Sequence, residues 1–288
     1  MSPDDGYQVL LIDLDGTVVD YARTEAAALA ALHAEFFSGH STFREFATAF
    51  HACNDELWAA YRRAELDLDD LRVERFARLL KQVKTAASLS AVVARFEAEL
   101  GRCVTMFPEA RSALRSLRRL ATLVLVTDGI AAVQHAKLSR CRLRRFFERV
   151  VISSEVGYRK PQPALLHRAL DQAGAATVRA LVVGDSGPSD GAGAHAAGLD
   201  FCWVNRTDQP EHAAGPVPAR FQVPDLSALV AVLAAQRIPA QQVPARQVPA
   251  RQVPARQVPA RQVPARQVPA RLSQPQQAFV AREFLHKR

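Results

Sequence analysis

The sequence has no long uninterrupted apolar segment. None of its runs approaches the roughly 20 apolar residues that a membrane-spanning helix requires. The first residues, MSPDDGYQ, are acidic, whereas a secretory signal begins with basic residues. We therefore expect a cytoplasmic protein without a membrane span.

Cysteine pairs are also absent. The chain has four cysteines among 288 residues, and they are scattered without a CxxC pair or a histidine at metal-ligand spacing. This pattern excludes a disulfide framework and a zinc site of the CxxC type, and predicts reduced thiols. Aromatic residues make up only 7%, but 49% of the residues are hydrophobic, which is enough for a substantial core.

Excess charge is missing from most of the chain, although the formal net charge is +8. Residues 237–288 contain nine arginines and one lysine against one glutamate, whereas residues 1–236 contain 27 basic and 28 acidic residues. The positive charge therefore indicates nothing about the main body of the protein. It leaves a weak, nonspecific anionic partner possible for the tail alone.

The tail is a tandem repeat. The unit QVPAR recurs six times without variation between Gln242 and Arg271. Proline in every unit prevents a continuous helix, and one valine per unit offers too little apolar surface to offset the entropy of ordering the chain. We predict that residues 237–288 are disordered. A tolerated appendage without function is the simplest interpretation of so regular a repeat.

The main body alternates between short apolar runs and segments with helical periodicity. The runs are continuously apolar, as is typical of strands buried on both faces of a parallel sheet. They are Val9–Ile12, Leu123–Val126, Val150–Ile152, Leu181–Val183 and Phe201–Val204. The helical segments are Glu109–Leu120, Ile130–Ser139, Pro163–Ala173 and Asp190–Ala197. This alternation predicts an α/β fold in which helices cover both faces of a doubly wound, Rossmann-like parallel sheet.

One long interval breaks the alternation. Between Thr17 and Phe107 no strand is indicated, and segments such as LDDLRVERFARLLKQV have helical periodicity. We predict an all-helical insertion over residues 20–100. The α/β core then consists of residues 1–19 and 101–236, followed by the tail.

Polar residues end four of the five predicted strands or follow them. In an open parallel sheet, groups at the carboxyl ends of the strands meet at one edge, where ligands bind. Four of these groups are the carboxylates of Asp13, Asp15, Asp185 and Asp190, which would repel one another in so small a space unless a cation neutralised them. An all-oxygen ligand set of this kind suits Mg²⁺. The residues expected to converge are Asp13, Asp15, Thr127, Asp128, Lys160, Asp185 and Asp190.

The motifs DLDGT (13–17), VTDG (126–129), GYRKP (157–161) and GDSGPSD (184–190) resemble, in order and spacing, the four motifs of the haloacid dehalogenase superfamily of phosphohydrolases. The helical insertion is similar to the cap that such enzymes carry after the first motif. Three further stretches resemble the pyrimidine 5′-nucleotidase branch. They are NDELWAAYRRAEL, VVISSEVGYRKPQP and HAAGLDFCWVNRTDQ. Two departures are Asp128, where the second motif usually has asparagine, and Ala64, where the branch often has glycine.

The resemblance implies a role for each residue. Asp13 would be the nucleophile that forms an aspartyl-phosphate, and Asp15 the general acid and then base. Mg²⁺ would be held by Asp13, the backbone carbonyl of Asp15 and Asp185, with Asp190 orienting the metal's ligands. Thr127 and Lys160 would hold the phosphoryl oxygens, with Asp128 beside them.

Together these observations predict a Mg²⁺-dependent phosphomonoesterase that acts on a small phosphorylated metabolite. The first candidate substrate is a nucleoside 5′-monophosphate, and the alternative is a sugar phosphate or another small organic phosphate. A regulatory protein that binds through its basic tail is a further alternative, which the intact carboxylates disfavour. A dehalogenase is disfavoured because halide displacement does not need Asp15 or the metal ligands.

Two other features favour structural interpretations. GDSGP is similar to the segment around a trypsin-like serine, but it lacks one glycine, and an alternating α/β chain is not a disulfide-bonded β-barrel. Trp58 and Tyr61, three residues apart in a predicted helix, most simply pack in the core of the insertion. The alternative is that they form a wall that stacks on a base or sugar.

Overall fold

A computed structural model of the chain describes residues 6–236 except 84, 86, 176–178 and 208–217. The predicted disorder of residues 237–288 concerns a segment outside these described residues. Within the described part, no helix is both long enough and apolar enough to span a membrane.

The core of the protein is a six-stranded sheet in which all neighbouring strands are parallel and the order is β3-β2-β1-β4-β5-β6. The strands are β1 (Val9–Ile12), β2 (Thr122–Thr127), β3 (Arg149–Ile152), β4 (Ala180–Gly184), β5 (Asp200–Val204) and β6 (Phe221–Val223). The chain builds β1, β2 and β3 outward to one edge and then crosses back to place β4 beside β1. The predicted doubly wound α/β fold is confirmed, with β6 as an additional edge strand.

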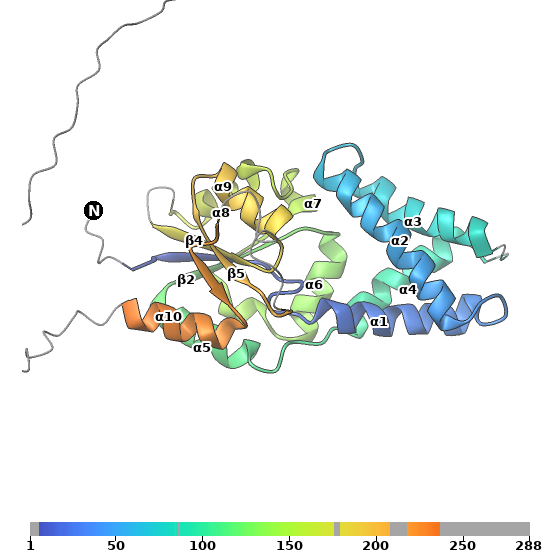
Figure 1. Cartoon of the computed structure of the whole chain (residues 1–288), viewed down its shortest axis with the longest axis horizontal. Helices are drawn as coiled ribbons and strands as arrows, with labels where there is room; N and C mark the ends of the chain where they lie inside the picture. The colour runs from blue at the N-terminus through green and yellow to red at the C-terminus, as the bar shows by residue number, and fades with distance from the viewer. Residues whose placement is uncertain (1–5, 84, 86, 176–178, 208–217, 237–288) are drawn as a thin grey trace, which may run out of the picture. The chain divides into compact units, whose positions relative to one another are not determined.

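Helices cover both faces of the sheet (Figure 1). One face carries α5 (Ala110–Leu120) and α10 (Leu226–Gln236), and the other carries α8 (Pro163–Gln172) and α9 (Ala192–Ala196). The remaining elements after α5 are α6 (Ala131–Arg140), η2 (Arg144–Phe146), α7 (Ser153–Val156) and the π-helix η3 (Gly187–Gly191). The segment predicted as one helix over residues 190–197 is divided between η3 and α9.

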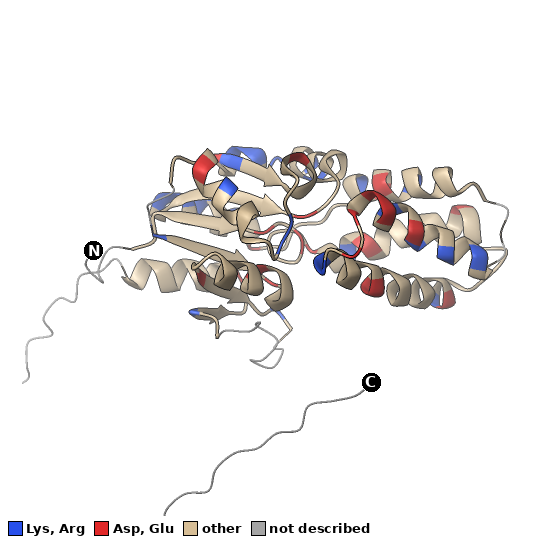
Figure 2. Cartoon of the chain, turned by 90° about the horizontal axis from the view of Figure 1, so that it is seen from above, with Lys and Arg blue, Asp and Glu red and all other residues tan. Residues whose placement is uncertain are grey.

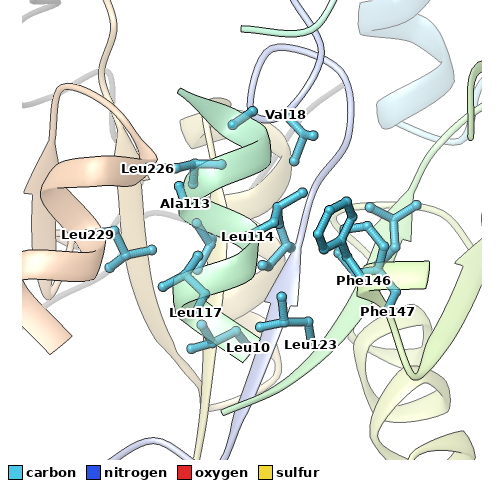
Figure 3. Packing of buried hydrophobic residues seen from close by; sticks show 14 of the residues in the cluster. Leu10, Val18, Ala113, Leu114, Leu117, Leu123, Phe146, Phe147, Leu226 and Leu229 are labelled. Atoms are coloured by element: carbon cyan, nitrogen blue, oxygen red, sulfur yellow. The ribbon is translucent and has the colours of Figure 1, made fainter. Parts of the chain in front are cut away.

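Side chains from β1 alternate between the two faces, which explains why the strand is apolar throughout. Leu10 and Ile12 pack against α5, and Val9 and Leu11 pack against α8. On the first face, Leu114 and Leu117 of α5 pack in one apolar cluster with Leu10 of β1 and with Leu226 and Leu229 of α10 (Figure 3). Each face is therefore closed by apolar packing, and only the ends of the strands are left to carry polar chemistry.

Four helices occupy the interval between β1 and α5. They are α1 (Tyr21–Leu32), α2 (Phe43–Arg62), α3 (Leu68–Val83) and α4 (Leu89–Arg102), with the π-helix η1 (His33–Phe37) continuing α1. The predicted helical character of this interval agrees with the structure. A separate apolar core, which includes Phe46, Phe50, Phe76 and Phe96, holds the four helices together.

Ala64 adopts a left-handed backbone conformation, with φ of 63°, directly after α2. This conformation crowds the Cβ of any residue except glycine. The structure thus explains why glycine would suit a position at which this chain has alanine.

Candidate active site

All seven residues predicted to form the site line one cavity of about 210 Å³. The cavity lies at the carboxyl ends of the strands, and residues of α1–α4 form its opposite wall. Acidic segments gather where the strand ends face these helices (Figure 2). The residues that the structure brings together are Asp13, Asp15, Thr127, Asp128, Lys160, Asp185 and Asp190.

The sheet topology accounts for this convergence. Asp13 directly follows β1, Asp185 directly follows β4, and these two strands are neighbours in register. The backbone N–H of Asp13 donates to the carbonyl of Val183 at 2.9 Å, which extends the pairing of β1 and β4 by one residue. The indole N–H of Trp203 in β5 holds the loop that follows β4, because it donates to the carbonyl of Asp185 at 2.9 Å.

Lys160 occupies the centre of the acidic group. Its Nζ lies 2.5 Å from Oδ1 of Asp13 and 2.7 Å from Oδ1 of Asp190. All three side chains are buried. Burial alone would lower the pKa of Lys160, but Asp13, Asp190 and Asp128 outweigh it and raise that pKa above its ordinary value. Lys160 is therefore a fixed positive charge beside Asp13.

Burial also raises the pKa values of the carboxyl groups. The pKa of Asp13 lies well above its usual range because the side chain is desolvated, and the charge of Lys160 only partly opposes this effect. Burial and the neighbouring Asp190 raise the pKa of Asp185 to about 7. The single positive charge of Lys160 is therefore not enough to balance the buried carboxyl groups around it.

The acidic residues fit a divalent cation. Asp13, Asp185 and Asp190 each offer a carboxylate oxygen, and these three atoms lie within 4.8 Å of one another. Two glycines make room for them, because a Cβ at Gly16 would lie 2.2 Å from Oδ2 of Asp185 and a Cβ at Gly184 would lie 2.2 Å from Oδ2 of Asp190. An all-carboxylate group of this size is the ligand type that Mg²⁺ prefers.

Asp15 is held by two residues that the sequence analysis did not identify. Lys137 Nζ lies 2.6 and 2.8 Å from the two carboxylate oxygens of Asp15, and Gln134 Nε2 donates to one of them at 3.0 Å. Gln134 also donates to Oγ1 of Thr127 at 2.7 Å. The sequence did carry one signal for these two residues. Gln134 and Lys137 are three positions apart and therefore share a face of α6, and two polar residues on the buried face of a helix are unusual.

The turn after Asp15 is supported from outside the cavity. Gly16 has a φ of 90°, a conformation that favours glycine. Arg206 donates to the carbonyl of Thr17 at 2.8 Å and to the carbonyl of Gly16 at 3.3 Å. This arginine stacks on Phe107 and pairs with Glu109 at 2.8 Å, so the turn is tied to the start of α5.

Asp128 contacts the loop that carries Lys160. Its Oδ1 accepts the backbone N–H of Lys160 at 3.2 Å, and burial raises its pKa to about 6. The contact links the end of β2 to the segment between α7 and α8. Asp128 therefore holds the backbone of Lys160, whereas its role beside the phosphate stays a prediction.

The wall opposite the strand ends contains both aromatic and basic residues. Trp58 lines the cavity, but Tyr61 is 3% exposed and packs with Leu57 and Leu71. The two interpretations of this aromatic pair thus apply to different residues: Tyr61 belongs to the packing of the helices, and Trp58 faces the cavity. Three arginines line the same wall, namely Arg62, Arg72 and Arg75.

Comparison with known proteins assigns the chain to a family. Residues 7–198 match the family model of the haloacid dehalogenase-like hydrolases. The chain is 34% identical to pyrimidine 5′-nucleotidase YjjG of Escherichia coli over 56% of this chain and 72% of that protein. It is 30% identical to a phosphoserine phosphatase of Thermus thermophilus over 71% of this chain and 91% of that protein.

A solved structure shows the same architecture. The HAD-hydrolase YfnB of Bacillus subtilis, in a crystal form bound to magnesium, matches 80% of this chain and 99% of its own with a TM-score of 0.71 and 25% identity.

Proposed function

The chain belongs to the haloacid dehalogenase-like hydrolases, and we propose that it is a Mg²⁺-dependent phosphomonoesterase acting through an aspartyl-phosphate on Asp13. The observation that carries the proposal is the position of Asp13, which lies beside Lys160 at the floor of the cavity while Asp15 lines the same cavity. A nucleophile, a proton donor and a phosphate-binding cation are the groups that transfer of a phosphoryl group to water requires.

In the first step, a carboxylate oxygen of Asp13 bonds to phosphorus as the ester P–O bond breaks, and Asp15 gives its proton to the departing alkoxide. In the second step, a water oxygen bonds to phosphorus, the bond between Asp13 and phosphorus breaks, and Asp15 takes the proton of the water. Lys160 and Thr127 hold phosphoryl oxygens during both steps. Lys137 and Gln134, which contact Asp15, keep its carboxyl group oriented.

The metal site fits this chemistry. Asp13, Asp185 and the backbone carbonyl of Asp15 would hold Mg²⁺, and Asp190, whose carboxylate lies beside them, would orient these ligands. When bound, the ion offsets the repulsion between the carboxylate of Asp13 and the incoming phosphate dianion. The raised pKa values of Asp13 and Asp185 support this assignment, because a bound cation would stabilise the ionised form of these buried carboxylates.

We propose nucleoside 5′-monophosphates as the first substrate class to test. The relative YjjG bears the name of a pyrimidine 5′-nucleotidase, and Trp58 offers an aromatic surface on which a base or sugar can stack. A sugar phosphate or another small organic phosphate is the second candidate, because another relative is named a phosphoserine phosphatase. In this proposal, residues 20–100 act as a substrate-selecting cap on a core formed by residues 1–19 and 101–236.

A panel assay tests the proposal. Phosphate release would be measured with 4-nitrophenyl phosphate, pyrimidine and purine nucleoside 5′-monophosphates and sugar phosphates, with Mg²⁺ and with EDTA. We expect Mg²⁺-dependent turnover that the substitution Asp13→Asn abolishes. Turnover that persists in EDTA or in folded Asp13→Asn protein would contradict the mechanism, and absence of turnover on every ester would contradict the function.

A further inference from the structure

We propose that the cap wall of the cavity is an anion-binding subsite, so that the substrate is a phosphate monoester with a second negatively charged group at the end away from the phosphate. This inference rests on the proposed phosphatase function, and within it favours small organic phosphates that carry a second anionic group over simple nucleoside 5′-monophosphates. The residues that form the subsite are Arg75 of α3 and Arg62 of α2.

Arg75 is a buried cation without a counter-ion in contact. Its side chain is 4% exposed, lines the cavity, and makes one hydrogen bond, to the neutral amide oxygen of Asn54 at 3.3 Å. Its Nε is buried and has no hydrogen-bond partner. Within the described residues, no carboxylate lies within ion-pair distance of this guanidinium; Glu25 and Glu97 act on it only from farther away, and burial still lowers its pKa. Burying a charged group without an ion-pair partner costs free energy, and an anionic ligand that pairs with the guanidinium offsets this cost.

Arg62 adds a second unpaired cation on the same wall. It lines the cavity one helical turn after Trp58, and among the residues that the structure describes it makes no hydrogen bond or ion pair. The third arginine of the wall differs, because Arg72 forms a bidentate pair with Glu97 at 2.7 and 2.8 Å. Two guanidinium groups therefore remain available to a ligand, and guanidinium binds carboxylate or phosphate oxygens in a bidentate manner.

The carboxylates at the floor of the cavity do not serve as counter-ions for Arg62 and Arg75. They are already paired with lysines: Asp13 and Asp190 with Lys160, and Asp15 with Lys137. Those carboxylates belong to the phosphate and metal end of the site. A ligand that extends from the phosphate to α2 and α3 would place its own anionic group beside Arg62 and Arg75.

A purely structural role for Arg75 is the competing explanation. Its guanidinium lies 4.7 Å from the ring centroid of Phe96 and 5.2 Å from that of Phe76, so cation–π contacts hold it in the core of α1–α4. These contacts leave the buried Nε of Arg75 without a conventional hydrogen-bond acceptor, and they do not involve Arg62. The two explanations predict different substrate selectivity.

Matched substrate pairs distinguish them. With the full chain and Mg²⁺, kcat/KM would be measured for 3-phosphoglycerate against glycerol 3-phosphate, a pair that differs by a carboxylate. The second pair, thymidine 3′,5′-bisphosphate against thymidine 5′-monophosphate, differs by a second phosphate. A preference for the member with the additional anion in one pair shows whether the subsite binds a carboxylate or a phosphate. In at least one pair, we expect kcat/KM to be about 10- to 100-fold higher for the member with the additional anionic group, which is the factor that a charge-assisted hydrogen bond permits.

Variants then assign the preference to residues. Arg62→Met and Arg75→Met should each lower kcat/KM by a larger factor for the member that carries the second anionic group than for the member without it or for 4-nitrophenyl phosphate. Arg78→Met is the matched control, because Arg78 lies on α3 outside the cavity and pairs with Glu74. If Arg75→Met does not fold, the wild-type preference and the half-exposed Arg62 still decide the question.

Equal kcat/KM for both members of both pairs in the wild-type protein would overturn the subsite, as would variants that keep the wild-type preference. Loss of stability in Arg75→Met without a change in selectivity would establish the packing role instead. Failure of the phosphatase proposal looks different, since no ester in any pair would then be hydrolysed.

Discussion

The substitution Gly184→Ala tests whether the close approach of Asp190 to the end of β4 is needed for metal binding. A Cβ at position 184 would lie 2.2 Å from both Cγ and Oδ2 of Asp190. Unbonded carbon atoms prefer separations of about 3.5–4.0 Å, so the carboxyl group must move by more than about 1 Å. Asp190 cannot move freely, because it is 3% exposed and is held by Lys160 and the backbone N–H of Ser186.

The expected result is weaker Mg²⁺ binding. Displacing a residue that orients metal ligands typically lowers metal affinity by about 10- to 100-fold, and overpacking of the site lowers the free energy of unfolding by about 1–3 kcal/mol. Calorimetric titration with Mg²⁺ gives the affinity, and thermal unfolding gives the stability. Gly193→Ala is the control, because a Cβ there would meet its nearest neighbour, Cα of Pro161, at an ordinary 3.5 Å. Unchanged Mg²⁺ affinity in folded Gly184→Ala protein would refute this account of the metal site.

Three further predictions follow from the site and the charge distribution. Asp15→Asn should still bind phosphate and Mg²⁺ but lose far more activity on alkyl phosphates than on 4-nitrophenyl phosphate, because a poor leaving group needs the proton; equal small losses on both esters would show that Asp15 is not the acid. Burial raises the pKa of Asp185 to about 7 and that of Asp128 to about 6, so the folded protein keeps protons that the unfolded chain, with aspartate pKa values of about 3.9, has already lost. The melting temperature in EDTA should therefore fall as the pH rises from 5 to 8, and a rise over this range would contradict those pKa values. Deleting residues 237–288 removes nine arginines but none of the residues that line the cavity, so kcat/KM for 4-nitrophenyl phosphate should be nearly unchanged, and a large loss would show that the tail contributes to the site.

Apolar runs and strand-end residues were enough to predict the sheet and the floor of the site. β1 has the predicted bounds, Val9–Ile12, because a strand buried on both faces must be apolar at every position. Convergence of Asp13 and Asp185 followed from the rule that strand ends in a parallel sheet meet at one edge. β6 was missed because its three residues, FQV, have no periodicity that separates them from a loop.

The residues that were missed act through tertiary contacts. Lys137 and Asp15 are 122 positions apart in the chain, and no local pattern shows that they meet. Arg75 appears in the sequence as one arginine of an amphipathic helix, indistinguishable from the exposed Arg78 until packing buries one and exposes the other. Burial and partners decide what such residues do, and both arise only from tertiary packing: α6 against the end of β1 for Lys137, and the helices α1–α4 for Arg75.

Covalent phosphorylation of Asp13 is the central claim, and rapid-quench mass spectrometry tests it most directly. The protein would be mixed with 4-nitrophenyl phosphate and Mg²⁺, quenched in acid within the first turnover, digested and analysed. We predict one added phosphoryl group on the peptide that contains Asp13, and none in the Asp13→Asn variant. Burst release of 4-nitrophenol with no phosphoryl group on that peptide, or with the group on another residue, would contradict it.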